Sequence, residues 1–139
     1  MSVPVMSEPP TADLPPPQVR SWATKFRDAF HGLLQGVHRQ SSFTVHFLCA
    51  TAVVALGGAL HVGWIEWSLL AAAIMLVLTA EMFNSALEAM ARAITGQFSP
   101  HLKSALNIGS AAVLLAAIGA ATIALLVFGH RLAELTGWW

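Results

Sequence analysis

The chain has 139 residues, of which 56% are hydrophobic and 10% charged, and its formal net charge is zero with the histidines counted as neutral. A chain of this length is expected to form one domain. Soluble domains carry about a quarter charged residues, so the deficit of charge indicates an integral membrane protein. A net charge of zero gives no basic surface for nucleic acid, and the single Cys49 cannot form an internal disulfide. The sequence has neither a GxxxxGKS/T nor a GxGxxG nucleotide loop.

The N-terminal end, residues 1–18, is predicted to be a disordered tail. It contains six prolines, together with Glu8 and Asp13. Proline removes a backbone N–H and clashes with the preceding turn in a helix interior, so this segment is too proline-rich for a helix. A secretory signal peptide has a basic start and an apolar centre, which this acidic segment lacks.

The first predicted helix covers residues 19–40 and is amphipathic. Apolar side chains recur at helical spacing, at Trp22, Phe26, Ala29, Phe30, Leu33, Leu34 and Val37. Polar and charged residues fall between them, at Lys25, Asp28, Gln35 and Arg39. This pattern suits a helix that lies on a membrane surface. A peripheral helix of a soluble bundle is the alternative.

Three further segments are apolar enough to cross a membrane, at about residues 43–62, 66–94 and 104–129. At about 1.5 Å per residue, they reach most or all of the way across a hydrocarbon core of ~30 Å. Gly63 marks the first connection and Pro100 lies in the second, and residues 131–139 are expected to form a C-terminal tail. The predicted fold class is therefore an all-α membrane protein with a surface helix and three transmembrane helices.

The distribution of basic residues predicts the orientation of these spans. Four of them precede the first span, none lies in the turn at 61–66, Arg92 and Lys103 flank the second connection, and only Arg131 follows the third span. Because Lys and Arg gather in cytoplasmic loops, we expect the N-terminus and the loop at 94–103 in the cytoplasm and the C-terminus outside.

The second span contains two carboxylates, Glu81 and Glu88, in an otherwise apolar stretch. A charged side chain at the centre of a membrane helix costs about 2.5–3.5 kcal/mol on insertion scales. The seven-residue separation is close to two helical turns, so Glu81, Asn84, Ser85 and Glu88 share one face. That face offers acceptors for a metal or a proton, an amide and a hydroxyl, within reach of a cytoplasmic solute.

The third span contains small residues at four-residue intervals, Ala105 with Gly109, and Ala112 with Ala116 and Ala120. Such rows let helices approach closely in lipid. Three short spans bury little surface by themselves, and two buried carboxylates need polar neighbours that another subunit can supply. We therefore expect a homo-oligomer.

Two motifs carry a resemblance to a known family. They are Glu81-Met82-Phe83-Asn84-Ser85-Ala86-Leu87-Glu88-Ala89 and Asn107-Ile108-Gly109-Ser110-Ala111-Ala112-Val113. Together they resemble the hallmark of the small bacterial diacylglycerol kinase and undecaprenol kinase family. Weaker matches are the segment 26–33 of the surface helix and Phe43 with His46 at the start of the first span. The resemblance covers about residues 22–128.

The resemblance implies a homotrimeric kinase of the inner membrane that transfers the γ-phosphoryl group of ATP to the hydroxyl group of a membrane lipid. By position, it implies that Glu81 is the general base, that Asn84 orders the site and that Glu88 ligates Mg²⁺. Ser85 and Ser110 are candidates for contacts with the lipid.

Diacylglycerol and undecaprenol both stay open as the lipid acceptor. His46, in the run from Phe43 to His46, is closer to the undecaprenol kinase type. The pairs Asn84-Ser85 and Gly109-Ser110 are closer to the diacylglycerol kinase type.

Several charged positions of the family pattern are replaced here. Where the family has a second metal-binding Glu this chain has Gln40, and where the family has an Arg after the Phe it has Thr44. Arg92 stands in place of an Asp one turn past Glu88, and Leu106-Asn107 replaces the Lys-Asp pair before the Gly-Ser-Ala-Ala stretch. Gln40 keeps a carbonyl oxygen as a candidate metal ligand. Arg92, Lys103 and Asn107 are the candidates for binding the ATP phosphates, and Arg92 can alternatively pair with Glu88 four residues earlier.

Three functions follow from these observations. The first is an active ATP-dependent lipid kinase. The second, favoured by the replaced charges, is a catalytically impaired relative that acts as a membrane binding or regulatory protein. The third is an unrelated proton-relay or packing protein in which Glu81 and Glu88 only pair across an oligomer. A zinc site is not favoured, because the six histidines lack metal-ligand spacing.

Overall fold

The computed structural model describes residues 20–39, 41–94 and 99–138, and within these ranges the secondary structure is entirely helical. The helices are α1 (Trp22–Arg39), α2 (Ser41–Ala59), α3 (Trp64–Ile94) and α4 (Pro100–Thr136). By length and composition, α2, α3 and α4 can each cross a membrane. The predicted fold class is therefore confirmed. The predicted tail at 1–18 lies outside the described residues.

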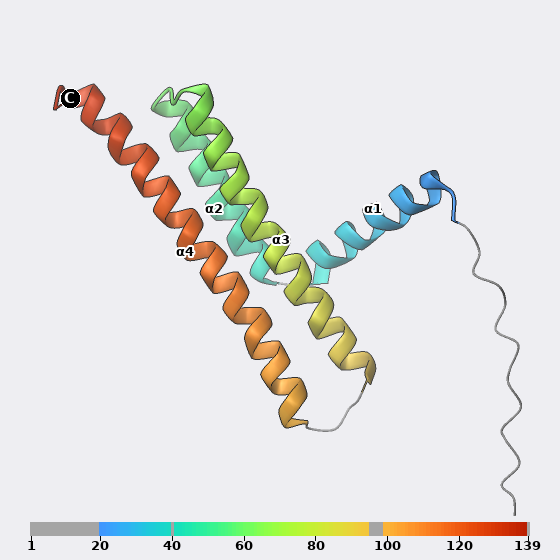
Figure 1. Cartoon of the computed structure of the whole chain (residues 1–139). Coiled ribbons are helices and arrows are strands. Elements are labelled where there is room, and N and C mark those ends of the chain that lie inside the picture. Colours follow the sequence, from blue (N-terminus) through green and yellow to red (C-terminus); the bar gives the residue numbers. More distant parts are fainter. Residues whose placement is uncertain (1–19, 40, 95–98, 139) are drawn as a thin grey trace, which may run out of the picture.

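α3 is the central helix of the molecule. Its most extensive packing is with α4, and it also contacts α2 and α1. Figure 1 shows α2, α3 and α4 running side by side, with the C-terminus near the α2–α3 turn and α1 leaving the bundle at an angle. Polar groups carried by α3 can therefore be reached from all three other helices.

α1 presents an apolar face that the described part of the chain leaves uncovered. The helix begins after Ser21, whose Oγ accepts a hydrogen bond from the backbone N–H of Thr24 at 3.2 Å. Trp22 and Phe26 are 74% and 72% exposed. Exposed aromatic side chains along one face of a helix are stable at a membrane interface, which is consistent with the predicted surface helix.

A tight turn joins α2 to α3 and sits over the apolar core. The N–H groups of Val62 and His61 bond to the carbonyls of Gly57 and Gly58, each at 3.2 Å, which is the Schellman pattern of helix termination. His61 takes the left-handed conformation of this motif, with φ 52°. Val62 is buried against Leu70 of α3 and Val127 of α4. The apolar core therefore lies at this end of the bundle.

α4 is longer at both ends than the sequence predicts. It begins at Pro100 rather than at about residue 104, because the side chain of Ser99 caps the backbone N–H of Leu102 and proline fits the first helical turn. It continues to Thr136 and ends where Gly137 takes φ 74°. Most of the predicted C-terminal tail is therefore helical. With 37 residues, α4 is about 55 Å long, so it extends beyond a hydrocarbon core of ~30 Å.

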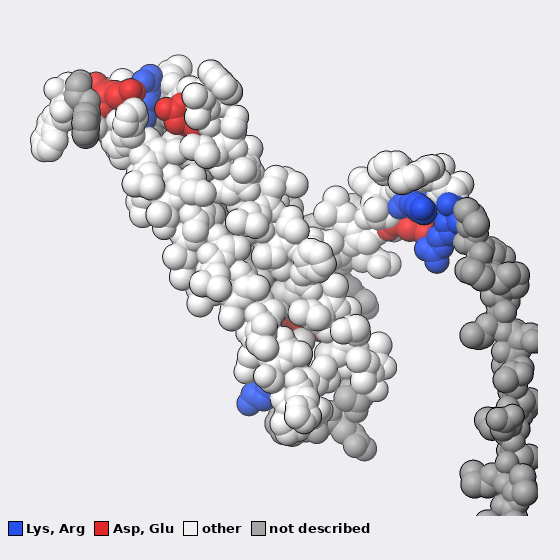
Figure 2. Space-filling model, in the orientation of Figure 1, with Lys and Arg blue, Asp and Glu red and all other residues white. Residues whose placement is uncertain are grey.

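Few charged side chains appear in the middle of the bundle on the face that Figure 2 shows. Figure 2 shows acidic and basic groups at one end of the bundle and on α1, and a basic group toward the other end, with a long, almost uncharged body between the two ends on this face. A body of this kind suits burial in lipid, because charged groups are costly at the bilayer centre.

Candidate functional site

The four polar residues that were predicted to share a face do lie together on α3. Glu81, Asn84 and Ser85 are buried, with 2%, 8% and 7% of their surfaces exposed. Glu88 is half-buried one turn beyond Asn84. Acidic residues are almost never fully buried without a partner, so Glu81 is the unusual group of this face.

Asn84, Glu88 and Arg92 form a connected series along α3. Asn84 Nδ2 donates a hydrogen bond to Glu88 Oε1 at 3.4 Å. Glu88 Oε2 lies 3.5 Å from Arg92 Nη1, and the Arg92 side chain is 61% exposed. Of the two roles predicted for Arg92, the structure thus contains the pairing with Glu88. A pair this exposed contributes only about 0–1 kcal/mol to stability, so Arg92 is not needed to hold the helix together.

Three buried oxygen atoms of the site have no hydrogen-bond partner among the described residues. They are Glu81 Oε1, Asn84 Oδ1 and Ser85 Oγ. A buried polar atom left unpaired costs about 1–3 kcal/mol, and native structures seldom leave several together. These atoms are therefore where a ligand or another chain is expected to bind.

α4 approaches the site at Gly109, which is buried. A Cβ atom at this position would lie 2.7 Å from Asn84 Oδ1 and 3.0 Å from Leu87 Cδ1. The missing side chain is therefore what allows α4 to lie against Asn84. Gly109 belongs to the predicted row of small residues, but Ala105 and Ala112 of that row are exposed.

His46 of α2 is the residue whose connection to Glu81 the sequence interpretation missed. Its Nε2 lies 3.8 Å from Glu81 Oε2, and the two side chains are 18% and 3% exposed. From the sequence, His46 indicated only the type of lipid acceptor. A usable signal was the short turn at 60–63, because it folds the start of α2 back toward the middle of α3.

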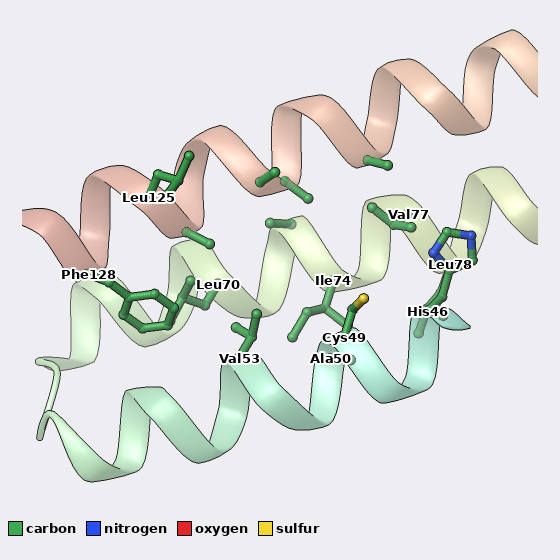
Figure 3. Close-up of a pocket in the computed structure, with 15 residues that line it drawn as sticks. His46, Cys49, Ala50, Val53, Leu70, Ile74, Val77, Leu78, Leu125 and Phe128 are labelled. Carbon is green, nitrogen blue, oxygen red and sulfur yellow. The ribbon is translucent and has the colours of Figure 1, made fainter. Parts of the chain in front are cut away.

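Two clefts open beside this polar face. The larger has a volume of about 450 Å³, lies between α2, α3 and α4, and has His46 and Val77 among its lining residues. Figure 3 shows His46 at one end of this cleft and Phe128 at the other, with apolar side chains between them. The smaller cleft, of about 210 Å³, has Gln35 of α1 and both Ser85 and Arg92 of α3 in its wall.

The other predicted site residues do not converge on Glu81. Lys103, Asn107 and Ser110 are exposed on the first three turns of α4. The Ser110 hydroxyl donates to the Leu106 carbonyl of its own helix at 3.1 Å. Gln40, the predicted second metal ligand, lies outside the described residues.

A divalent cation at this site would depend on few protein ligands. Within the ranges that the structure describes, no three or more His, Cys, Asp or Glu side chains form a metal-binding group. Glu88 offers one half-buried carboxylate beside Asn84. Mg²⁺ commonly binds through one or two carboxylates, several waters and the phosphates of a substrate, so this donor set fits Mg²⁺ bound together with a nucleotide.

Comparison with known proteins identifies relatives of the chain. Residues 27–128 match the family model described as prokaryotic diacylglycerol kinase. A diacylglycerol kinase from Synechocystis sp. is 34% identical over 99 residues, which cover 70% of this chain and 57% of that relative. The match therefore spans little more than half the length of the Synechocystis protein.

Proposed function

The chain belongs to the prokaryotic diacylglycerol kinase family, and from this premise we propose that it is a membrane lipid kinase that transfers the γ-phosphoryl group of ATP to the hydroxyl group of diacylglycerol or undecaprenol. The observation that carries the proposal is the placement of Glu81. This buried carboxylate lies beside His46, which lines the apolar cleft, and on the same helix as the pair of Glu88 and Arg92.

The large cleft supports a lipid as the acceptor. Its walls are almost entirely apolar, from Phe128 to His46. A lipid of the bilayer can place a hydrocarbon chain there, because the apolar lining resembles the acyl chains that otherwise surround it. In this pose the hydroxyl group at the head of the lipid lies next to His46 and Glu81. Ser85, whose buried Oγ has no partner among the described residues, is the better placed of the two serines to bind the headgroup.

In the proposed reaction Glu81 is the general base. The lipid hydroxyl oxygen attacks the γ-phosphorus, the bond from that phosphorus to the β-phosphate oxygen breaks, and the hydroxyl proton passes to the Glu81 carboxylate. The products are the lipid phosphate and ADP. Asn84 lies one turn from Glu81 and binds Glu88 at 3.4 Å, so it orders the groups on the nucleotide side. Phosphoryl transfer depends mainly on such positioning and on neutralisation of charge.

Glu88 and Arg92 are proposed to hold the nucleotide. Mg²⁺, ligated by Glu88, would neutralise charge on the phosphates when bound. Arg92 is exposed beyond Glu88, and its planar guanidinium group can bind a phosphate by two parallel hydrogen bonds. Lys103 and Asn107 at the start of α4 are the remaining phosphate-binding candidates. With the loop at 94–103 in the cytoplasm, this side of the site faces cellular ATP.

We also propose that the chain acts as a homotrimer in the inner membrane. Large apolar side chains of α4 such as Leu114, Leu115 and Leu125 are between 61% and 74% exposed. Three buried oxygen atoms of the site also lack partners within the described residues. A neighbouring copy can cover the first group and supply a hydrogen bond to Asn84 Oδ1, the atom of the second group to which the proposed reaction gives no partner.

The proposed function is tested with the purified full-length protein in mixed micelles that contain labelled ATP, Mg²⁺ and either diacylglycerol or undecaprenol. We expect phosphorylation of one of these lipids. Glu81→Gln keeps the shape of the side chain but removes the base, so turnover should fall by about 10²-fold or more. Glu66→Gln changes a carboxylate in the first turn of the same helix and should leave turnover unchanged. Turnover that survives Glu81→Gln would refute the assignment of the base.

The same assay addresses the impaired relative as a second candidate function. The observation that favours it is the loss of family charges at Leu106 and Asn107, together with Arg92 in place of an acidic residue. A wild-type protein that phosphorylates neither lipid, but gains activity with Gln40→Glu, Leu106→Lys and Asn107→Asp combined, would support a binding or regulatory role. Robust wild-type turnover would exclude it.

A further inference from the structure

We infer that His46 is a positioning residue for Glu81, whose Nε2–H group holds carboxylate oxygen Oε2 and thereby presents Oε1 to the acceptor hydroxyl. The inference rests on the proposed lipid kinase function, in which Glu81 is the base. Its structural basis is the approach of His46 Nε2 to Glu81 Oε2 at 3.8 Å, inside the bundle and between two different helices.

The two oxygen atoms of Glu81 have different surroundings. Oε2 faces the His46 ring, whereas Oε1 is buried and has no hydrogen-bond partner among the described residues. Because an ionised carboxylate only accepts hydrogen bonds, the ring proton is assigned to the nitrogen that faces it. The distance exceeds the ~2.7–3.2 Å of a hydrogen bond, but contacts of catalytic groups are often long without substrate and shorten in the complex.

Two other polar groups of this helix face are directed toward Glu88. Asn84 Nδ2 donates to Glu88, and Arg92 also pairs with Glu88. Within the described ranges, the ring of His46 is the group that lies within ion-pair distance of the Glu81 carboxylate. Phe43, one turn earlier on α2, is 2% exposed and fixes the start of that helix in the bundle.

His46 also occupies the route by which the lipid hydroxyl reaches the base. Apart from the thiol of Cys49, it is the polar side chain in the wall of the large cleft. Figure 3 shows its ring at the end of that cleft. A hydroxyl group that enters from the cleft thus meets His46, whose Nε2 lies 3.8 Å from Glu81 Oε2. Because misplacement of a catalytic group by 1 Å can cost about 10²-fold in rate, a contact that fixes the carboxylate at this point matters for turnover.

The test compares four variants of the full-length protein in the micelle assay. His46→Leu removes the donor, whereas His46→Gln places an amide N–H near the position of Nε2 and His46→Asn places it nearer to Nδ1. His130→Leu is the matched control, because His130 also faces a carboxylate, Glu134, at 3.9 Å, but on the exposed end of α4. Turnover number and KM for MgATP are measured with whichever lipid the wild type phosphorylates.

We expect His46→Leu to lower the turnover number by about 10- to 100-fold, with the KM for MgATP unchanged, because the orientation of the base and not nucleotide binding is lost. His46→Gln should recover most of that loss and exceed His46→Asn, and His130→Leu should match the wild type. Wild-type turnover in His46→Leu would overturn the inference, as would equal losses in the Leu and Gln variants. If His46→Leu does not fold, the turnover numbers of the other two variants decide: His46→Gln above His46→Asn supports the inference, and the reverse order overturns it. A wild-type protein that is inactive on both lipids refutes the proposed kinase function itself. That result differs from the results that refute only the role of His46.

Discussion

At the scale of single residues, the amide of Asn84 links the two sides of the candidate site. Its Nδ2 donates to Glu88 Oε1 at 3.4 Å. Its Oδ1 lies where α4 approaches, 2.7 Å from the position that a Cβ atom on Gly109 would occupy. The orientation of Asn84, and with it that of Glu88, therefore depends on the absence of a side chain at residue 109.

Gly109→Ala is expected to displace Asn84 and to weaken its bond to Glu88, because the added methyl group overlaps the amide oxygen. Overpacking of this kind costs about 1–3 kcal/mol of stability, and lipid kinase turnover should fall with it. Gly119→Ala is the control on the same helix, since a Cβ atom there meets nothing within 4 Å. Thermal unfolding followed by tryptophan fluorescence, together with turnover, measures both effects. Identical behaviour of the two variants would contradict this account.

At the scale of helices, the end of the bundle that carries the α2–α3 turn is stabilised separately from the polar site. Arg131 of α4 donates from Nε to the carbonyl of Leu60 at 2.9 Å. Its Nη1 also contacts Glu134 Oε2 at 2.6 Å. Leu60 follows the last residue of α2, where helix carbonyls lack partners, so this contact ties the end of α2 to α4. Glu81 is about 25 Å away along α3, at ~1.5 Å per residue.

Arg131→Ala should therefore lower stability without changing the chemistry of the site. The loss of a hydrogen bond from a charged donor costs about 1–3 kcal/mol. We expect a lower midpoint of thermal unfolding in micelles and an unchanged turnover number at a temperature below that midpoint. His130→Ala alters the neighbouring, exposed residue and should leave the midpoint unchanged. A loss of turnover in Arg131→Ala at low temperature would show that the two ends are coupled.

At the scale of the whole molecule, the three helices that are long and apolar enough to cross a membrane would place α1 and the end of α4 on opposite sides of a bilayer. α1 lies near the half of α3 that carries Ser85, where the two helices form the wall of the smaller cleft. The C-terminus lies near the α2–α3 turn, at the far end of the bundle (Figure 1). The polar site is therefore nearer to the membrane surface that α1 occupies, which the basic residues predict to be cytoplasmic.

Labelling of single cysteines tests this orientation. In a Cys49→Ser background, Ala23→Cys marks α1 and Trp138→Cys marks the C-terminal end, and both positions are exposed. A membrane-impermeant maleimide should label Trp138→Cys in intact spheroplasts and Ala23→Cys only after the membrane is opened. The opposite pattern would invert the predicted orientation. Labelling of both in intact spheroplasts would contradict three spans.

The sequence by itself determined the features that depend on neighbours along the chain. Helical periodicity placed Glu81, Asn84, Ser85 and Glu88 on one face, and long apolar runs defined three spans. Helix ends were less predictable: Pro100 was interpreted as part of a break, whereas the cap at Ser99 makes it the first residue of α4. The motif around Glu81 also predicted the family, which the comparisons confirm.

Only the tertiary structure decided which residues meet across helices. The contact of His46 with Glu81, the approach of Gly109 to Asn84 and the two clefts depend on how each helix is rotated and shifted against its neighbours. Rotation and shift are set jointly by the side chains of both packed surfaces, and no periodicity within one helix encodes them. The sequence therefore predicted Glu81 as the base and placed it on its turn of the helix, whereas packing selected the histidine that faces it.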